Sequence, residues 1–378
     1  MLIKRELQPL LEKSVLNREV VSILYGPRQA GKTTLLKELM KTRQKVWWVN
    51  GDDLGAQEIF SQARLEFLKE KIGDSQWVVI DEAQRIENIG LSLKLIHDHL
   101  PAKLVVSGSA SFELASKINE PLTGRTETFW LYPLSLKEVE LERVPEVTEA
   151  GWWGKILRFG LYPRIWRLVG EENKQRYLEE MVDKYLYHDL LSFEKVRKPK
   201  LVVDLLRLLA FQVGSEVSVN ELASRLAISR QTVESYLDLL EKMFVLVRLG
   251  GFSRNLRREI YRSAKYYFVD VGLRNALVRD WRELGWRNDV GQLWENLMVM
   301  EIIKRYNNQA KRANFYFWRT YNGQEIDLVV EEGGKLKGYE FKWNERKKAK
   351  KPKLFLETYP SSKFAVINRK NWNMDLSF

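Results

Sequence analysis

The sequence predicts an α/β protein of several domains, the first of which is a parallel sheet covered by helices on both faces. The chain has 378 residues, which exceeds the ~100–200 residues of a usual domain. In its first third, short apolar runs alternate with amphipathic stretches, and nearly continuous apolar runs are typical of parallel strands buried on both faces. The predicted strands are Val20–Tyr25, Val46–Val49, Trp77–Ile80, Leu104–Ser107 and Glu127–Leu131.

The pattern divides the chain into four regions. Residues 1–135 carry the parallel sheet, residues 136–200 are predicted to be a helical connector, residues 201–255 a compact helical unit, and residues 256–378 a second α/β region. In the last region we expect a helix over Leu293–Tyr306 and strands at Phe315–Trp318, Glu325–Val330 and Lys337–Trp343.

Composition excludes several classes of protein. A hydrophobic share of 45% excludes a mainly disordered chain, and no run reaches the ~18 apolar residues of a membrane span. The absence of cysteine excludes disulfides, thiolate catalysis and cysteine-ligated zinc, and three histidines are too few for a histidine-based metal site. We therefore expect a cytoplasmic protein.

The charge balance favours a polyanionic partner. Lys and Arg number 62 against 50 Asp and Glu, a net charge of +12. The clearest local excess is the basic run Arg346–Lys353, which is either a solvated loop or a surface that contacts phosphates.

A nucleotide-binding loop follows the first predicted strand. The spacing G-x-x-x-x-G-K-[ST] lets the backbone wrap phosphates, places a lysine beside the β- and γ-phosphates of ATP and offers a hydroxyl to Mg²⁺. The residues that carry it are Gly26, Pro27, Arg28, Gln29, Ala30, Gly31, Lys32 and Thr33, and Thr34 opens the helix that follows. Because strand, loop and helix come in this order, the pattern predicts binding of ATP with Mg²⁺.

Two carboxylates end the third predicted strand. Asp81 suits the Mg²⁺ shell, and Glu82 suits the activation of a water for attack on the γ-phosphate. The glutamate directly after the aspartate favours hydrolysis over binding alone.

Further polar residues follow the neighbouring strands. Ser107 and Ser109 either sense the γ-phosphate or cap the next helix. Arg125 is either a surface residue or an arginine finger, acting within one chain or from a neighbour in a homo-oligomer, and Arg28 is the competing candidate.

In combination these motifs resemble a family of prokaryotic, mainly archaeal, AAA+-type ATPases related to the STAND signalling ATPases. The resemblance is carried by Gly26–Thr34, Ile80–Gln84, Ser107–Ser111, Leu122–Arg125, Leu131–Ser135, Lys265–Gly272 and Glu340–Lys342. It implies an AAA+-like ATP-binding core, a winged helix and a C-terminal restriction-endonuclease-like domain. The chain departs from the family in the turn Gly160–Arg164, where Leu161 replaces a glycine and Arg164 replaces an acidic residue.

The third region also reads as a winged helix from its own residues. Ser218 and Glu221 form a capping box, a short turn leads to a second amphipathic helix, and a strand follows at Val245–Leu249. The second helix carries Arg230, which could contact DNA phosphates, and Glu234, which would repel them. The unit is therefore predicted either to contact DNA or to form a structural lid for the nucleotide domain.

The last region contains an Asp…Glu-x-Lys pattern similar to that of restriction-type nucleases. If the two strands pair, Asp327 and Glu340 can approach one divalent ion, with Lys342 beside an attacking water and Glu295 as an extra acidic residue. Solvated strand charges are the alternative, and Trp318 and Trp343 are either base-stacking or core residues.

Together the residues predict a Mg²⁺-dependent ATPase whose nucleotide state repositions the winged-helix and nuclease-like domains on DNA. The alternative is a STAND-like signalling switch that binds protein partners and keeps the C-terminal fold as an inactive scaffold.

Overall fold

In a computed structural model of the chain, the structure describes residues 3–109, 117–118, 120–141, 148–186, 198–253, 264–320, 323–346 and 349–373. The chain divides into two compact units. Unit 1 comprises Met1–Leu134, Lys242–Phe244 and Asn307–Ala310, and unit 2 comprises Ser135–Glu241, Val245–Tyr306 and Lys311–Phe378. Among the described residues, no helix combines the length and apolar character needed to cross a membrane.

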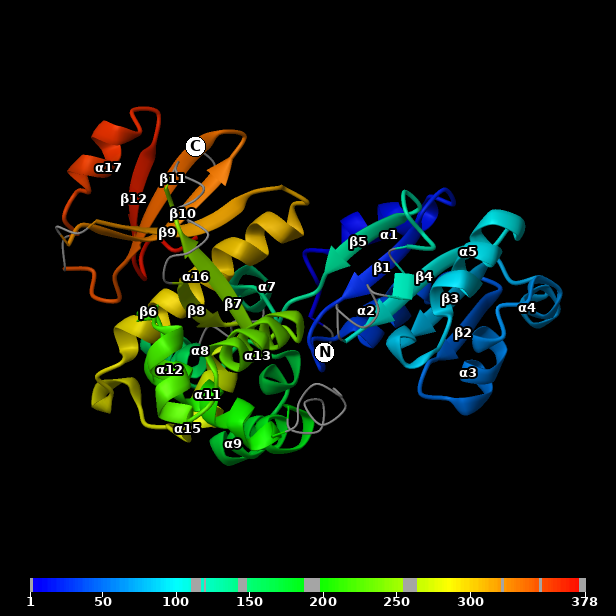
Figure 1. The fold of residues 1–378 in the computed structure, drawn as a ribbon, viewed down its shortest axis with the longest axis horizontal. Helices are drawn as coiled ribbons and strands as arrows, with labels where there is room; N and C mark the ends of the chain where they lie inside the picture. Colours follow the sequence, from blue (N-terminus) through cyan, green and yellow to red (C-terminus); the bar gives the residue numbers. More distant parts are fainter. Residues whose placement is uncertain are drawn as a thin grey trace. The chain divides into compact units, whose positions relative to one another are not determined.

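Unit 1 is built on a parallel sheet of five strands in the order β2-β3-β4-β1-β5 (Figure 1). The strands are β1 (Val21–Tyr25), β2 (Val46–Asn50), β3 (Trp77–Asp81), β4 (Lys103–Gly108) and β5 (Thr126–Trp130). The helices are α1 (Gln8–Leu16), α2 (Lys32–Met40), α3 (Leu54–Ser61), α4 (Leu65–Ile72) and α5 (Ile89–His99). The predicted parallel sheet is confirmed, and each strand end lies within one residue of the predicted position.

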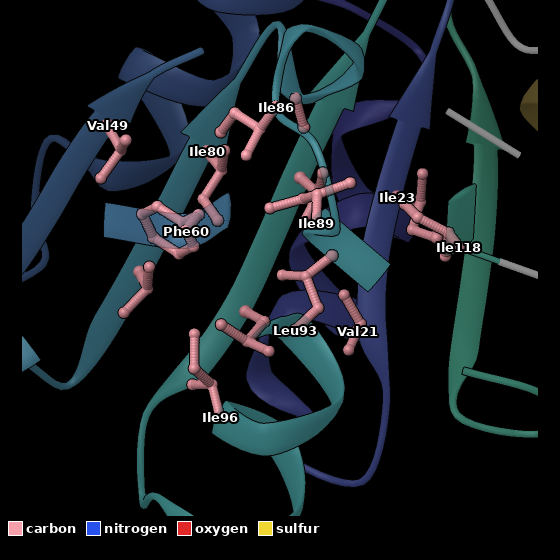
Figure 2. Packing of buried hydrophobic residues seen from close by; sticks show 14 of the residues in the cluster. Val21, Ile23, Val49, Phe60, Ile80, Ile86, Ile89, Leu93, Ile96 and Ile118 are labelled. Carbon is pink, nitrogen blue, oxygen red and sulfur yellow. The ribbon is translucent and has the colours of Figure 1, made fainter. Parts of the chain in front are cut away.

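Helices cover both faces of this sheet, which explains why the strands read as continuous apolar runs. Successive residues of a strand point to opposite faces. In β1 and β3, Val21 and Ile80 belong to the cluster shown in Figure 2, which packs against α3, α4 and α5. Their neighbours on the other face, Leu24 and Val79, pack with residues of α1 and α2.

The helices of unit 2 come from three stretches of the chain. The longest of those described, α16, contains the whole of the predicted helix Leu293–Tyr306 and extends it at both ends. The helices are α7 (Leu136–Glu140), α8 (Glu149–Phe159), α9 (Glu171–Glu180), α11 (Pro199–Phe211), α12 (Val219–Leu226), α13 (Arg230–Lys242), α15 (Val271–Val278), α16 (Val290–Asn308) and α17 (Lys353–Thr358). Short helical turns lie at Pro163–Trp166, Met181–Leu186 and Leu284–Trp286.

Unit 2 contains one mixed sheet of seven strands in the order β12-β11-β10-β9-β7-β8-β6 (Figure 1). The strands are β6 (Glu216–Val217), β7 (Leu246–Gly251), β8 (Ala264–Phe268), β9 (Asn314–Arg319), β10 (Glu325–Glu332), β11 (Lys335–Phe341) and β12 (Lys363–Ile367). The sheet does not break at the predicted boundary between residues 255 and 256, because β7 pairs with β8 on one side and with β9 on the other. The helical unit and the C-terminal α/β region therefore share a single sheet.

The turn that departs from the resembled family anchors two helices of unit 2. Gly160 adopts a φ of 73°, and the backbone N–H of Leu161 donates to the Asp270 carboxylate at 2.6 Å. Asp270 is buried and also caps α15 by accepting from the N–H groups of Gly272 and Leu273. The turn thus joins the end of α8 to the start of α15.

Candidate nucleotide site and C-terminal carboxylate cluster

The predicted phosphate loop connects β1 to α2 and depends on two glycines for different reasons. A Cβ at Gly26 would lie 2.2 Å from the carbonyl oxygen of Leu131, so the loop passes too close to its neighbour for any side chain. Gly31 adopts a φ of 98° directly before the helix, in the left-handed region that glycine enters without strain. The loop amides and the helix N-terminus lie at the carboxyl edge of the sheet, where phosphates are bound in such folds.

Lys32 is buried and lies against its own loop. Its Nζ donates to the carbonyl oxygens of Gly26 at 2.9 Å and Pro27 at 3.1 Å. A second cation, Arg5, also contacts the loop and was not predicted from the sequence. The Arg5 guanidinium donates to the carbonyl oxygens of Ala30 at 2.7 Å and Tyr132 at 2.6 Å, and no local pattern marks an arginine for that contact.

The structure brings Thr33, Asp81 and Ser107 together. The Thr33 hydroxyl donates to Asp81 Oδ2 at 2.6 Å, and the Ser107 hydroxyl donates to the other carboxylate oxygen, Oδ1. These contacts form because β1 and β3 both flank β4, so their carboxyl ends meet at one edge. A hydroxyl and a carboxylate side by side are hard oxygen ligands of the kind that Mg²⁺ takes from a protein, so these residues fit a magnesium ion.

Glu82 is held by a separate set of contacts. Its backbone has a φ of 52°, and its Oε2 accepts from Gln84 Nε2 at 2.6 Å. The same Nε2 lies 3.0 Å from Ser109 Oγ. Burial alone would raise the pKa of Glu82, but the Lys32 ammonium and hydrogen bonds from Gln84 and Ser109 hold that pKa below its ordinary value. Glu82 is therefore kept ionised beside the phosphate loop.

The two candidate arginines lie in different places. Arg28 is close enough to Glu82 to help lower its pKa. The structure does not bring Arg125 to the site, because its backbone carbonyl accepts from the N–H of Val21 at the amino end of β1, the opposite edge of the sheet. Its Nε donates to Asp98 Oδ1 at 3.0 Å. Of the alternatives left open for Arg125, this position does not support action within its own chain, and a role from a neighbouring copy stays a prediction.

In unit 2 the predicted C-terminal carboxylates lie on neighbouring strands. Leu328 pairs with Tyr339 in the antiparallel ladder of β10 and β11, which places Asp327 beside Glu340. Asp327 Oδ2 accepts from the backbone N–H of Phe341 at 2.8 Å. Lys342 Nζ donates to Glu340 Oε1 at 2.5 Å.

Two residues of β8 that sequence reasoning did not assign complete this cluster. Lys265, 1% exposed, lies 2.5 Å from Glu325 Oε1 and 3.6 Å from Glu295 Oε1. The Tyr267 hydroxyl donates to Glu295 Oε1 at 2.6 Å. Lys265 and Tyr267 are two residues apart on one strand, so their side chains lie on the same face. This spacing is the sequence pattern from which both could have been predicted to belong to the cluster.

Burial governs the protonation of these carboxyl groups. It raises the pKa of Asp327 well above its ordinary value, and the nearby Glu295 and Glu340 add to that rise. Burial also raises the pKa of Glu295, while Lys265 and the Tyr267 hydroxyl oppose it.

The cluster contains a buried cation, Lys265, beside its carboxylates. Over the described ranges, no group of three or more His, Cys, Asp or Glu side chains is placed to hold a metal ion. The positive charge between Glu295 and Glu325 comes instead from Lys265. Asp327 and Glu340 lie side by side, and their role as ligands of one divalent ion stays a prediction.

The two tryptophans predicted either to stack on bases or to lie in the core, Trp318 and Trp343, both pack against other aromatic side chains. Trp318 is buried and packs edge-to-face on Phe355 with ring centroids 5.2 Å apart, so it is a core residue. Trp343 packs on Trp294 at 5.7 Å, and the Arg369 guanidinium lies 4.6 Å from its ring. In the basic run, Lys347 and Lys348 lie outside the described residues.

Family models match three consecutive parts of the chain. An AAA domain model matches residues 18–140, a domain of unknown function (DUF8612) matches residues 152–288, and a second domain of unknown function (DUF4143) matches residues 290–377. The chain therefore contains an AAA-type P-loop domain in its N-terminal third.

The chain is similar to uncharacterised proteins over most of its length and to a solved structure in its fold. An uncharacterised protein of Mycobacterium tuberculosis is 29% identical over 90% of this chain and 74% of its own length. An uncharacterised protein of Methanocaldococcus jannaschii is 23% identical over 94% of this chain and 84% of its own length. A Walker-type ATPase of Pyrococcus abyssi superposes with a TM-score of 0.52 at 18% identity, over 73% of this chain and 96% of that one, and so shares the fold.

Proposed function

We propose that the protein is a Mg²⁺-dependent ATPase that acts in the cytoplasm. The observation that carries this proposal is the meeting of the loop residues Lys32 and Thr33 with Asp81 and Glu82 at one edge of the sheet. A fold shared with a protein described as a Walker-type ATPase supports it. Lys32 would bind the β- and γ-phosphates, and Thr33 and Asp81 would hold the magnesium ion.

The proposed reaction is attack of water on the γ-phosphate. Glu82 takes a proton from the water, whose oxygen forms a bond to the γ-phosphorus, and the bond from that phosphorus to the bridging oxygen of ADP breaks. The magnesium ion, when bound, neutralises charge on the phosphate oxygens. Of the two candidate arginines, Arg28 is the one placed to stabilise the developing charge beside Lys32, whereas a role for Arg125 would require a second copy of the chain.

Substitutions in the loop and at Glu82 test this proposal separately. Lys32→Ala is expected to weaken ATP binding at least about tenfold, because the phosphates lose their nearest point charge. Lys37→Ala, which changes an exposed lysine one turn further along α2, should leave binding unchanged. Glu82→Gln should keep ATP binding in calorimetry while phosphate release falls about a hundredfold or more. A wild-type chain that shows no heat with Mg·ATP would overturn the proposal.

We also propose that nucleotide state is coupled to DNA binding by a winged helix in unit 2. The order α11, β6, α12, α13, β7, β8, with β8 pairing to both β6 and β7, supports a winged helix. A net charge of +12 favours a phosphate backbone as partner. On α13, Arg230 pairs with Glu234 at 2.9 Å, and this neighbouring carboxylate reduces the positive charge that the arginine offers to a phosphate.

The role of the C-terminal cluster has two candidates. Asp327, Glu340 and Lys342 support a nuclease-like site because of their register and closeness. Lys265, paired with Glu295 and Glu325, favours the other candidate, a signalling switch that binds protein partners and retains the fold as scaffold.

One experiment with plasmid DNA separates these candidates. Wild type, Lys32→Ala and Asp327→Ala are incubated with ATP, plasmid and Mg²⁺ or Mn²⁺. Nicking that is lost only in Asp327→Ala supports the nuclease, whereas ATP hydrolysis without nicking in any variant supports the switch. Filter binding over a salt series tests the DNA proposal itself, because phosphate contacts make affinity fall steeply with salt.

A further inference from the structure

The contacts around Glu82 single out a residue to which the ATPase proposal gives no role. Gln84 lies two positions further along, in a 3₁₀ turn over Ala83–Arg85, and is 4% exposed. Its Nε2 donates to Glu82 Oε2 at 2.6 Å and to Ser109 Oγ at 3.0 Å. The Ser109 hydroxyl in turn donates a hydrogen bond to the Glu82 carboxylate. The three side chains therefore form a closed hydrogen-bonded triangle.

The orientation of the Gln84 amide follows from this triangle. A carboxylate only accepts hydrogen bonds, so the group facing Glu82 must be the NH₂ and not the carbonyl oxygen. Both amide hydrogens are then used, one toward Glu82 and one toward Ser109. A glutamine rotated by half a turn would place two oxygens against each other.

The backbone on both sides of the triangle is fixed. Glu82 is in the left-handed region with a φ of 52°, and a Cβ at Gly51 would lie 2.3 Å from its carbonyl oxygen. The Lys117 ammonium donates to the carbonyl oxygens of Gln84 at 2.5 Å and Ile86 at 3.1 Å. Neither Glu82 nor Gln84 can shift without breaking contacts to another element.

The amide oxygen of Gln84 has no hydrogen-bond partner among the described residues, which indicates what the glutamine contributes at this position. Within the part of the chain that the structure describes, Oε1 is buried and accepts no hydrogen bond. A buried polar atom without a partner costs about 1–3 kcal/mol, so glutamine is a poor choice for stability alone. The part of the amide that makes hydrogen bonds is the NH₂ group, which donates to Glu82.

We propose that Gln84 is the positioning residue of the ATPase reaction, holding the Glu82 carboxylate, together with Ser109, in the orientation from which it takes the proton of the attacking water. This inference rests on the proposed ATP hydrolysis. A carboxylate has about four acceptor positions, so the held group still has room for a water. Because Gln84 acts through Glu82, its loss should lower turnover and leave nucleotide affinity intact.

The test uses Gln84→Met in the full chain, a side chain of similar length that cannot donate. We expect kcat to fall about 10- to 100-fold, as misorientation of a catalytic group does, with KM for ATP within about twofold and an unchanged or higher melting temperature. Ser109→Ala should lower kcat as well, and Ser109→Thr, which keeps the hydroxyl, should restore most of it. Gln76→Met, at an exposed glutamine before β3, is the matched control and should change nothing.

A double-mutant cycle with Glu82→Gln completes the test. If Gln84 acts only through Glu82, adding Gln84→Met to Glu82→Gln lowers kcat no further. An unchanged or raised kcat in Gln84→Met overturns the proposal, as does a parallel loss of ATP affinity and melting temperature, which indicates a structural role. A wild-type chain that binds but does not hydrolyse ATP removes the hydrolysis proposal and this one together, whereas an active wild type with an equally active Gln84→Met removes this one alone.

Discussion

Single glycines determine several of the tight positions in both units. Gly26 is required by the close approach of the Leu131 carbonyl, and Gly31 by its positive φ. Gly160 combines both demands, since its φ is 73° and a Cβ would lie 1.9 Å from Asp270 Oδ1. The turn Gly160–Arg164 therefore keeps a structural role, although Leu161 and Arg164 differ from the residues of the resembled family.

Two glycine substitutions in the same segment should have opposite effects on stability. Gly160→Ala places a Cβ against a buried carboxylate in a strained backbone conformation, so we expect a loss of at least about 2 kcal/mol. Gly154→Ala lies inside α8 with no atom within 4 Å of the new Cβ, so a gain of about 0.5–1 kcal/mol is expected. Urea unfolding of both variants measures the difference, and equal stabilities would contradict the role given to Gly160.

The site residues that could be predicted from the sequence are those that belong to a short motif. The loop from Gly26 to Thr33 and the pair Asp81 and Glu82 are recognisable by spacing, because phosphate binding needs glycines, a lysine and a hydroxyl in one loop. Arg5 was not, since its partner Tyr132 lies 127 positions away. Lys265 was not either, since Glu325 lies 60 positions away. Arg125 was assigned from its residue type, and only the sheet showed at which edge it lies.

At the level of elements, the strands of unit 1 followed from hydrophobic pattern alone. The strands of the β10–β11 hairpin were also predicted from the hydrophobic pattern. The burial of carboxyl groups that results from their pairing was not. Pairing of the two strands buries Asp327 beside Glu340, and the preceding helix α16 brings Glu295 to the same place. Carboxyl groups crowded in this way pay an energetic penalty when ionised.

This crowding predicts a pH-dependent effect of Asp327→Asn. The folded chain binds the Asp327 proton more tightly than the unfolded chain, so the free energy of unfolding falls as pH rises from the ordinary carboxyl pKa of 3.8 through the raised value. Asparagine does not ionise and its carbonyl oxygen can still accept from Phe341. We therefore expect Asp327→Asn to raise the melting temperature at pH 7 and to lose that gain near pH 4.

Thermal unfolding of wild type and variant from pH 4 to pH 8 checks this prediction. Glu331→Gln, on the same strand but partly exposed, is the control and should change stability little. A variant that is less stable than wild type at pH 7 would show that the Asp327 charge is compensated, for example by Lys265.

At the level of the whole molecule, the chain is organised as two units, and unit 2 combines most of the last three of the four predicted regions. The seven-stranded sheet of unit 2 runs from β6, ahead of α12, to β12 near the end of the chain. The elements proposed as a winged helix and those proposed as nuclease-like are thus parts of one hydrogen-bonded sheet. Cooperative unfolding is expected to follow such a sheet.

Core substitutions in each unit test this organisation. Val329→Ala in β10 and Val79→Ala in β3 both remove fully buried methyl groups, at a cost of about 2 kcal/mol each. In hydrogen exchange, Val329→Ala should speed exchange of β7 and β8 as well as β10, while Val79→Ala should affect the sheet of unit 1. Exchange in β7 and β8 that does not respond to Val329→Ala would mean that the two parts of the sheet unfold separately.

By itself the sequence determined the parallel sheet and the identity of the phosphate loop, because strand periodicity and loop chemistry depend on neighbouring residues. Only the tertiary structure decided which distant side chains meet, such as Ser109 with Gln84 and Lys265 with Glu295 and Glu325. It also decided that Arg125 lies at the edge of the sheet opposite the loop. The reason is physical. Strand order, register and helix packing bring together residues far apart in the chain, and these depend on the burial of the whole core rather than on any local pattern.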